Sequence, residues 1–372
     1  MRRFTRVASV VAVAGLVATA CGSSKPSSTP ATTAAGATTA TTAASSGGSG
    51  GTKFQACMVT DTGGIDDRSF NASSYQGLKD AAASDPAIVP SYVPSTTESD
   101  YTPNINSLVQ KGCGIIVTVG FLMGDATQAA AKANPNQKFA IVDYNYSPPL
   151  PNVLGLIFNT AQAGFLGGYL AAGMTKTGTV ATFGGQKLPT VTVYMDGFYD
   201  GVQYYNSQHG KHVKVLGWNE ATQNGTFTGD FTDQSKGKSD TLAFIQQGAD
   251  IIFPVAGNVG LGAAAAAQQN GNGVHLLWVD TDGCVSAPQY CSLFYSSVVK
   301  GISVAVAKAA TDAAKGSFTG GNYVGTLANN GVGLAPYAKD VPQSLQTELA
   351  TVKQGIISGS IKVASPSAPA SS

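Results

Sequence analysis

Two stretches of the chain share one pattern: SLVQKGCGIIVTVGFLMGDATQAAAKAN, residues 107–134, and AFIQQGADIIFPVAGNVGLGAAAAAQQN, residues 243–270. In each copy a helix ends at glycine, at Gly112 or at Gly248, and a continuous apolar run predicts a strand buried on both faces. An alanine-rich helix and a second apolar strand follow. This βαβ order predicts a parallel sheet covered by helices, and its repetition predicts two similar α/β lobes.

Aspartates close the predicted strands. Asp61 follows FQACMVT, Asp143 follows FAIV and Asp280 follows LLWV. Phe70 and Phe198 each stand near the start of a helix, one in each lobe. Ligands of open α/β sheets bind beyond the carboxyl ends of the strands, so we expect these side chains to face one cleft between the lobes.

The beginning of the chain has the pattern of an export signal. Three arginines in residues 1–6 precede an uncharged run that ends before Cys21. We predict a signal peptide at residues 1–20 and a lipid on Cys21; the alternative is ordinary signal cleavage beside a stray cysteine. Residues 21–52 are rich in Ser, Thr, Ala and Gly, which predicts a flexible tether to the outer face of the cell membrane.

Net charge and chain length limit the class of protein and the number of domains. Removing residues 1–21 lowers the formal net charge from +1 to −2, and the rest of the chain has no basic stripe, which argues against nucleic-acid binding. Roughly 310 residues remain between Lys53 and Val363, more than one hydrophobic core usually serves. Two domains are therefore expected, followed by a disordered tail at residues 364–372.

Four cysteines remain in the exported body, and an even number in an exported chain favours disulfides. Cys284 and Cys291 enclose only six residues, so we predict that they pair. That leaves Cys57 to pair with Cys113. Neither C-x-x-C spacing nor a nearby histidine pattern indicates a metal site.

Enzymatic chemistry has little support in the sequence. The chain lacks a G-x-S-x-G elbow, and its three histidines have no evident nucleophile partner. GNVGLG, residues 257–262, lacks both the Walker lysine and the glycine order of dinucleotide sites. The sequence therefore predicts a binding protein with no catalytic residues, no metal and no cofactor.

Four stretches carry a specific resemblance: MVTDTGGIDDRSFN (residues 58–71), GCGIIVTVGF (residues 112–121), FNTAQAGFLGGYLAAG (residues 158–173) and SVVKGISVAV (residues 297–306). They resemble the basic membrane protein family, bacterial substrate-binding lipoproteins of ABC importers. The resemblance implies a type I periplasmic-binding-protein fold with two Rossmann-like lobes and a hinge of three crossover strands. It places lobe one at residues 53–158 and 284–320, and lobe two at residues 159–283 and 321–363.

The resemblance also implies a site for a purine nucleoside. The base would stack between Phe70 and Phe198, and Asn71 and Asp143 would contact its polar edge. Asp280 and Lys300 would hold the ribose hydroxyls. Asp61 matches the family's first-strand motif, and we expect it either to bind the ligand or to support the loop. The complete set of expected ligand-binding residues is Asp61, Phe70, Asn71, Asp143, Phe198, Asp280 and Lys300.

Each of these residues has a structural alternative. The two phenylalanines can be core residues, Asn71 can cap a helix, and Lys300 can be a solvated helix lysine. Asp66 and Asp67 are expected to shape the turn. Gly114 and Gly283 depart from the family pattern, in which Asp and Gln are frequent.

The expected function is delivery of a purine nucleoside, by a monomer held at the membrane by its lipid, to an ABC permease and its ATPase. A different small polar ligand such as a sugar, or a receptor that signals instead of transporting, are the alternatives.

Overall fold

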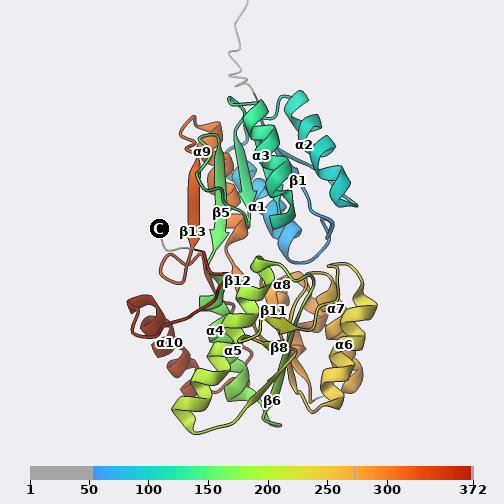
Figure 1. The fold of residues 1–372 in the computed structure, drawn as a ribbon, viewed down its shortest axis with the longest axis vertical. Helices are drawn as coiled ribbons and strands as arrows, with labels where there is room; N and C mark the ends of the chain where they lie inside the picture. Colours follow the sequence, from blue (N-terminus) through green and yellow to red (C-terminus); the bar gives the residue numbers. More distant parts are fainter. Residues whose placement is uncertain (1–52, 272, 370–372) are drawn as a thin grey trace, which may run out of the picture. The chain divides into compact units, whose positions relative to one another are not determined.

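The computed structural model describes residues 53–271 and 273–369. Its helices and strands alternate and build two six-stranded sheets, one in each of two lobes (Figure 1). The predicted signal peptide, Cys21 and the linker at residues 21–52 lie outside the described residues. Among the described residues, no helix has the length and apolar content needed to cross a membrane.

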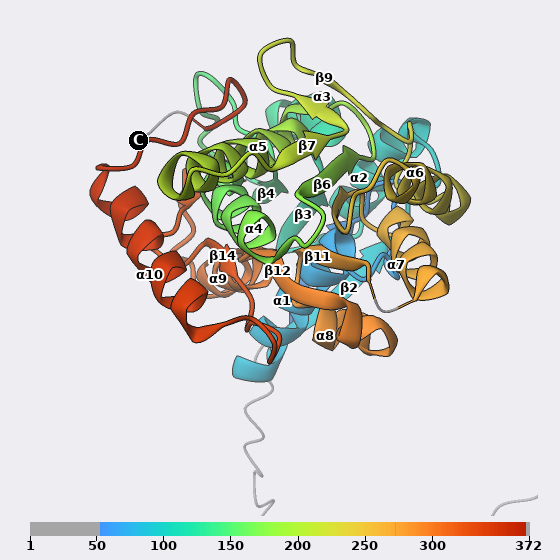
Figure 2. The same ribbon diagram turned by 90° about the horizontal axis from the view of Figure 1, so that it is seen from below.

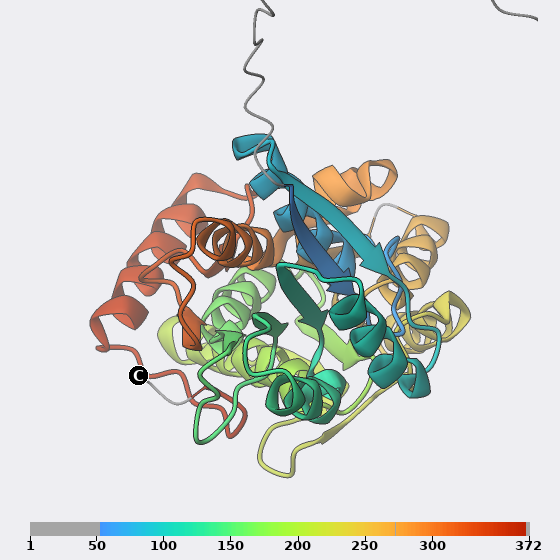
Figure 3. The same ribbon diagram turned by 90° about the horizontal axis from the view of Figure 1, so that it is seen from above.

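The first sheet forms lobe one and has the strand order β13-β5-β4-β3-β1-β2, with every neighbouring pair parallel. Helices α1 and α9 cover one face and α2 and α3 the other, as the view from above shows (Figure 3). The strands are β1 (Phe54–Val59), β2 (Ile88–Val93), β3 (Ile115–Val119), β4 (Phe139–Val142), β5 (Val153–Phe158) and β13 (Gly321–Gly325). The helices are α1 (Phe70–Ser84), α2 (Tyr101–Gln110), α3 (Gly124–Ala133) and α9 (Ile302–Ala314), with short 3-10 turns at Glu98–Asp100 and Phe121–Met123.

The second sheet forms lobe two in the order β14-β12-β11-β10-β6-β7, and only β14 runs antiparallel to its neighbour among these strands. Helices α4 and α5 lie on one side of it and α6 and α7 on the other (Figure 2). The strands are β6 (Thr179–Gly184), β7 (Lys214–Leu216), β10 (Ile251–Val255), β11 (His275–Asp280), β12 (Phe294–Lys300) and β14 (Val332–Leu334), beside a small hairpin of β8 (Trp218–Asn219) and β9 (Asn224–Gly225). The helices are α4 (Thr160–Met174), α5 (Pro189–His209), α6 (Gln234–Gln246), α7 (Val259–Asn270), α8 (Gly283–Ser286) and α10 (Gln343–Ser358), with a 3-10 turn at Pro288–Leu293.

The duplicated sequence occupies equivalent places in the two lobes. Both apolar runs form central strands, β3 and β10, in which every residue is buried. Gly112 and Gly248 precede these strands with φ of 74° and 92°, the left-handed conformation in which glycine is not strained. Since the repeat builds one parallel sheet in each lobe, the predicted α/β class with two Rossmann-like lobes is confirmed.

The three connections between the lobes differ in part from the boundaries expected at residues 158, 283 and 320. The first falls at Asn159, between β5 and α4. Residues 294–300 form β12 beside β11 in lobe two, so the second crossing lies at Gly301. Residues 321–325 form β13 beside β5 in lobe one, so the third lies at residues 326–331. The expected second and third boundaries are therefore wrong, because strand pairing with β11 and β5 decides where these segments belong.

The end of the chain is also ordered further than expected. The described part of the tail, residues 364–369, docks on α5 instead of being disordered. Ser365 Oγ donates to Asp196 Oδ2 at 2.5 Å, and Ser367 Oγ lies 2.9 Å from Thr192 Oγ1. These polar contacts hold a segment that its composition assigns to disorder.

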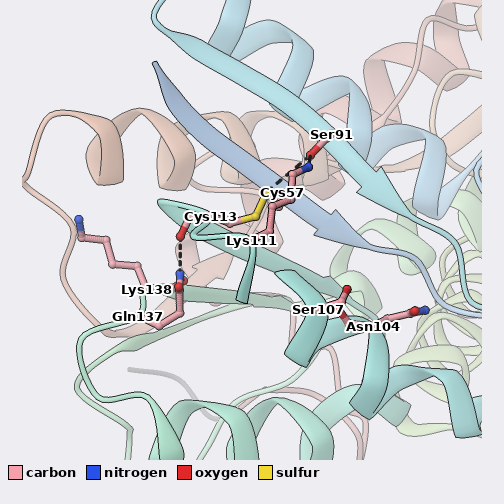
Figure 4. The surroundings of a disulfide bond; sticks show 8 residues. All are labelled: Cys57, Ser91, Asn104, Ser107, Lys111, Cys113, Gln137 and Lys138. Carbon is pink, nitrogen blue, oxygen red and sulfur yellow. Dashed lines mark hydrogen bonds between the residues drawn. A yellow bond between two sulfur atoms is a disulfide. The ribbon is translucent and has the colours of Figure 1, made fainter. Parts of the chain in front are cut away.

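Both predicted disulfides are present. Cys57 in β1 is bonded to Cys113 in the loop before β3, which ties two neighbouring strands together (Figure 4). Gln137 donates to the carbonyl of Cys113 at 3.0 Å beside this bond. Cys284 and Cys291 are also bonded and close the turn that leads into β12.

Candidate functional site

A cavity lies between the lobes and encloses about 710 Å³ of empty space, the opening to solvent included. The ends of β1, β3 and β4 approach it from lobe one, and those of β10, β11 and β12 from lobe two. The start of α5 closes it on a further side. This is the position at which open α/β sheets bind ligands. The predicted residues that line it are Asp61, Phe70, Asn71, Asp143, Asp280 and Lys300.

The loop before α1 is organised by Asp67. Its carboxylate accepts hydrogen bonds from the backbone N–H groups of Ser69, Asn71 and Ala72 at 3.0, 2.7 and 3.0 Å. These are the free donors of the first helical turn, which a carboxylate satisfies well. Burial raises the pKa of Asp67 to about 7. Asp67 therefore shapes the turn, as the sequence predicts.

Asn71 holds Asp61 in place. The Asn71 side-chain amide donates to Asp61 Oδ1 at 2.6 Å and to Asp67 Oδ2 at 3.1 Å, while its oxygen accepts from the Asp61 backbone at 3.1 Å. Both of its donors are thus used inside the loop. Burial raises the pKa of Asp61, against the hydrogen bonds from Asn71 and Gly63. In this arrangement Asn71 positions the carboxylate of Asp61 at the cavity wall.

Asp143 and Asp280 occupy equivalent places in the two copies of the repeat. Their φ angles are 67° and 64°, a left-handed conformation that costs energy for residues other than glycine. Such outliers gather where a side chain must be aimed, and here both carboxylates point to one ammonium. Lys300 Nζ lies 2.6 Å from Asp143 Oδ2 and 3.8 Å from Asp280 Oδ1. Burial raises the pKa of Asp143, and Lys300 opposes that rise.

Lys300 also sits among aromatic rings. Its Nζ lies 4.9 Å from the ring centre of Phe70, 5.5 Å from that of Tyr194 and 5.6 Å from that of Phe158. These distances are within the range of cation–π attraction. Lys300 is buried, so the alternative of a solvated helix lysine does not hold.

Hydrogen bonds cross between the lobes next to the cavity. Ser69 Oγ of lobe one donates to Asp280 Oδ2 of lobe two at 2.7 Å, and within lobe two Tyr194 Oη donates to the other oxygen, Oδ1, at 2.6 Å. Thr281 Oγ1 and Trp278 Nε1 donate to the carbonyl of Arg68 at 3.0 and 3.4 Å. The lobes therefore touch directly at the edge of the cavity, as in the closed state of a hinged binding protein.

Phe198 does not line the cavity, so the prediction that it stacks on the ligand is wrong for this structure. It is fully buried, packs 5.4 Å from the ring of Phe253, and its carbonyl lies against Gly168 of α4. One helical turn earlier, Tyr194 stands at the cavity wall. Phe198, one turn further along α5, packs between the helix and the sheet. It is therefore a core residue, the alternative role considered for it.

Several lining residues were not predicted. Phe231 lies in the polar run GDFTD, where a lone aromatic ring is a usable signal. Tyr101 begins α2, and its buried Oη makes no close hydrogen bond to the part of the chain that the structure describes. Buried polar groups are normally hydrogen-bonded, so Tyr101 Oη is a candidate for contact with a ligand. The two departures from the family pattern, Gly114 and Gly283, lie outside the lining.

Known proteins with similar sequences include substrate-binding proteins, in agreement with a ligand site between two lobes. The family described as ABC transporter substrate-binding protein, PnrA-like, matches residues 54–366. The chain belongs to this family. An ABC transporter nucleoside-binding protein of Lactococcus lactis subsp. cremoris is 31% identical over 332 residues, which cover 84% of this chain and 90% of that protein. A CD4+ T-cell-stimulating antigen of Listeria monocytogenes is 30% identical over 378 residues, 97% of this chain and 98% of its own.

The fold has solved counterparts as well. A solute-binding protein of an ABC transporter system from Aeropyrum pernix matches with a TM-score of 0.76 and 24% identity, over 84% of this chain and 94% of that structure. The family match and the curated relatives confirm the resemblance to the basic membrane protein family. As a PnrA-like protein, this chain is an extracytoplasmic substrate-binding component of an ABC transporter, a class that binds its substrates without converting them.

Proposed function

We propose that this PnrA-like protein binds a purine nucleoside in the interlobe cavity and delivers it to the permease of an ABC importer. One observation carries the proposal most directly: an aromatic ring, Phe70, stands beside a buried Asp143–Lys300–Asp280 cluster at the cavity wall. A ring provides a stacking surface for a base, and carboxylates with an ammonium suit vicinal hydroxyls. A nucleoside offers both parts in one molecule.

The charges of the cavity support a ligand without negative charge. Four carboxylates line it, those of Asp61, Asp67, Asp143 and Asp280, against the single ammonium of Lys300 among the described lining residues. A phosphate would face this excess of acid, whereas a neutral nucleoside would not. The name of the Lactococcus relative, a nucleoside-binding protein, agrees with that inference.

The second ring of the stack is assigned here to Phe231 instead of Phe198. Phe231 lines the cavity from lobe two, so a base placed against Phe70 would meet it when the lobes are closed. Tyr101 and Asp61, which both line the cavity, would contact the edge of the base. Because stacking contributes about 1–3 kcal/mol per base, rings on both lobes would couple binding to closure.

Anchoring belongs to the same proposal. The run before Cys21 and the tether after it support a lipid anchor on the outer face of the cell membrane. Mass spectrometry of the N-terminal peptide from the membrane fraction tests this. A diacylated cysteine is expected at position 21, and an unmodified N-terminus elsewhere would contradict the anchor.

Native mass spectrometry of the protein purified from cells, without added ligand, tests the ligand class. We expect a co-bound species whose mass after release is that of a purine nucleoside. A released sugar would change the ligand class and leave the two-lobed binding site in place. A released nucleotide would contradict the charge argument.

A further inference from the structure

A second cavity adjoins the first beyond the Asp143–Lys300 pair. It also encloses about 710 Å³ of empty space with its opening. Four residues line both cavities: Phe121, Asp143, Thr190 and Lys300. The two spaces are thus neighbouring chambers, and the Asp143–Lys300 salt bridge lies at the boundary that they share.

The end of the chain forms part of the wall of this second chamber. Ser367 and Pro369 line it, together with Tyr144 and Asn145 of lobe one. Figure 1 shows the dark red segment after α10 running to the junction of the two lobes. The chamber therefore has one side that is made by residues 364–369 and not by either sheet.

The docking of this segment is built into lobe two. Asp196 is fully buried, and its Oδ1 accepts from Trp218 Nε1 at 3.0 Å and from Gln223 Nε2 at 2.8 Å. Its Oδ2 accepts from Ser365 Oγ at 2.5 Å, and no other hydrogen bond reaches that oxygen among the described residues. A buried carboxylate that lacks a donor is costly, so Asp196 selects a segment with a hydroxyl at this position.

Further contacts hold the segment beyond Ser365. Ser367 Oγ lies 2.9 Å from Thr192 Oγ1 of α5, and the Ala368 N–H donates to the carbonyl of Ser365 at 3.1 Å. Ala368 is partly buried against the core. The turn at residues 365–368 thus presents Ser367 and Pro369 to the chamber.

The chemistry of the second chamber is neutral. Apart from the Asp143–Lys300 pair, its described lining consists of aromatic, amide, hydroxyl and aliphatic groups. Lys300 is already paired with Asp143 at 2.6 Å and is near Asp280, so it offers little compensation to a further anion. The chamber suits an uncharged substituent and disfavours a phosphate.

We propose that this chamber is a second subsite, walled by residues 364–369, which accepts an uncharged substituent at the ribose end of a bound nucleoside. The proposal rests on the proposed function, because it extends the ligand past the Asp143–Lys300 pair from the nucleoside site. Nucleosides whose terminal hydroxyl carries or is replaced by a neutral group belong to the expected substrates, and nucleotides do not.

Calorimetry with three probes tests the subsite: adenosine, methylthioadenosine, which carries a neutral methylthio group at the end of the ribose, and adenosine monophosphate. The full chain is expected to bind the first two within about tenfold of each other and adenosine monophosphate at least about 100-fold more weakly than adenosine. A chain that ends at Val363 is expected to lose at least about tenfold in affinity for methylthioadenosine and less than about threefold for adenosine. Equal losses for both, or none, would overturn the subsite, as would tight binding of adenosine monophosphate.

Hydrogen–deuterium exchange of the ligand-free protein tests the wall separately from the nucleoside. Amides of residues 364, 367 and 368 are expected to be protected in the full chain, and Ser365→Ala is expected to release them. Ser360→Ala removes a surface hydroxyl of the same chain end and serves as the matched control, with protection retained. Exchange at unprotected rates in the full chain would overturn the wall. Protection without binding of any nucleoside would instead show that the proposed function had failed while the segment was docked.

Discussion

Replacing Lys300 with Met tests the charge cluster at the centre of the site. Lys300 Nζ is 2.6 Å from Asp143 Oδ2, and the lysine side chain is 3% exposed. Met keeps much of the side-chain volume but removes the ammonium, so the buried carboxylate of Asp143 loses its counter-ion. Breaking a buried pair in this way costs about 3–5 kcal/mol, and we expect a loss of unfolding free energy of about that size at neutral pH.

The loss of unfolding free energy is expected to depend on pH and on the residue at position 143. Burial already raises the pKa of Asp143, and without Lys300 the carboxyl takes up a proton more readily, so the penalty shrinks as the pH falls. Lys300→Met combined with Asp143→Asn removes both members of the closest pair, while Asp280 keeps its hydrogen bonds from Ser69 and Tyr194, so the double variant is expected to recover most of the lost stability.

Urea unfolding of the ligand-free protein, followed by circular dichroism, measures these differences. Lys308→Met is the control, because Lys308 is exposed and pairs with Asp312 on the surface of α9. Its removal is expected to cost less than about 1 kcal/mol. If Lys300→Met cost no more than the control, or if Asp143→Asn gave no recovery, the reading of a coupled buried pair would be refuted.

Three further variants probe single residues. Phe70→Ala is expected to weaken nucleoside binding in calorimetry at least about tenfold, as one lost stacking face predicts, and an unchanged Kd would remove Phe70 from the site. Phe198→Ala is expected to lower the free energy of unfolding by about 3–5 kcal/mol through a core cavity, with nucleoside affinity changed less than about threefold; lost binding at full stability would restore its predicted ligand role. Burial and the nearby Asp200 raise the pKa of Glu220 to about 7, from 4.5. The protonated form is therefore favoured by the fold, and Glu220 contributes stability below about pH 4.5 that is lost as the pH rises through about 7. Glu220→Gln should flatten the fall of Tm between pH 5 and pH 8, and an equal slope in both proteins would contradict this origin.

The parts of the fold that depend on residues close together in the sequence were predictable. The apolar runs of β3 and β10, their preceding glycines and the aspartates after β4 and β11 are all visible in the repeat. Two of the three crossing points were not predictable in this way. The places of β12 and β13 depend on pairing with strands far away in the chain, and a local pattern carries no record of that partner.

The residues of the site also divide into those that the sequence predicts and those that it does not. The sequence locates Asp143 at a strand end and Phe70 at a helix start, whereas Lys300 was expected in the site only through the family resemblance. It does not distinguish Tyr194 from Phe198, because both lie on one face of α5 a single turn apart, and only depth against the sheet separates them.

Composition misled in the tail. Residues 364–369 contain serine, proline and alanine, which predict disorder, yet their docking depends on Asp196, a carboxylate about 170 residues earlier. Asn71 is a related case at short range. Its amide fits a base edge on sequence grounds, but both of its donors are taken by Asp61 and Asp67.

Calorimetry on delipidated, ligand-stripped protein with adenosine, guanosine, inosine and free ribose measures whether the interlobe cavity binds a purine nucleoside. We expect saturable binding of at least one purine nucleoside at one site per chain, with free ribose bound far more weakly because it leaves Phe70 and Phe231 without a stacking partner. Clear binding of ribose with no heat from any of the three nucleosides would contradict it.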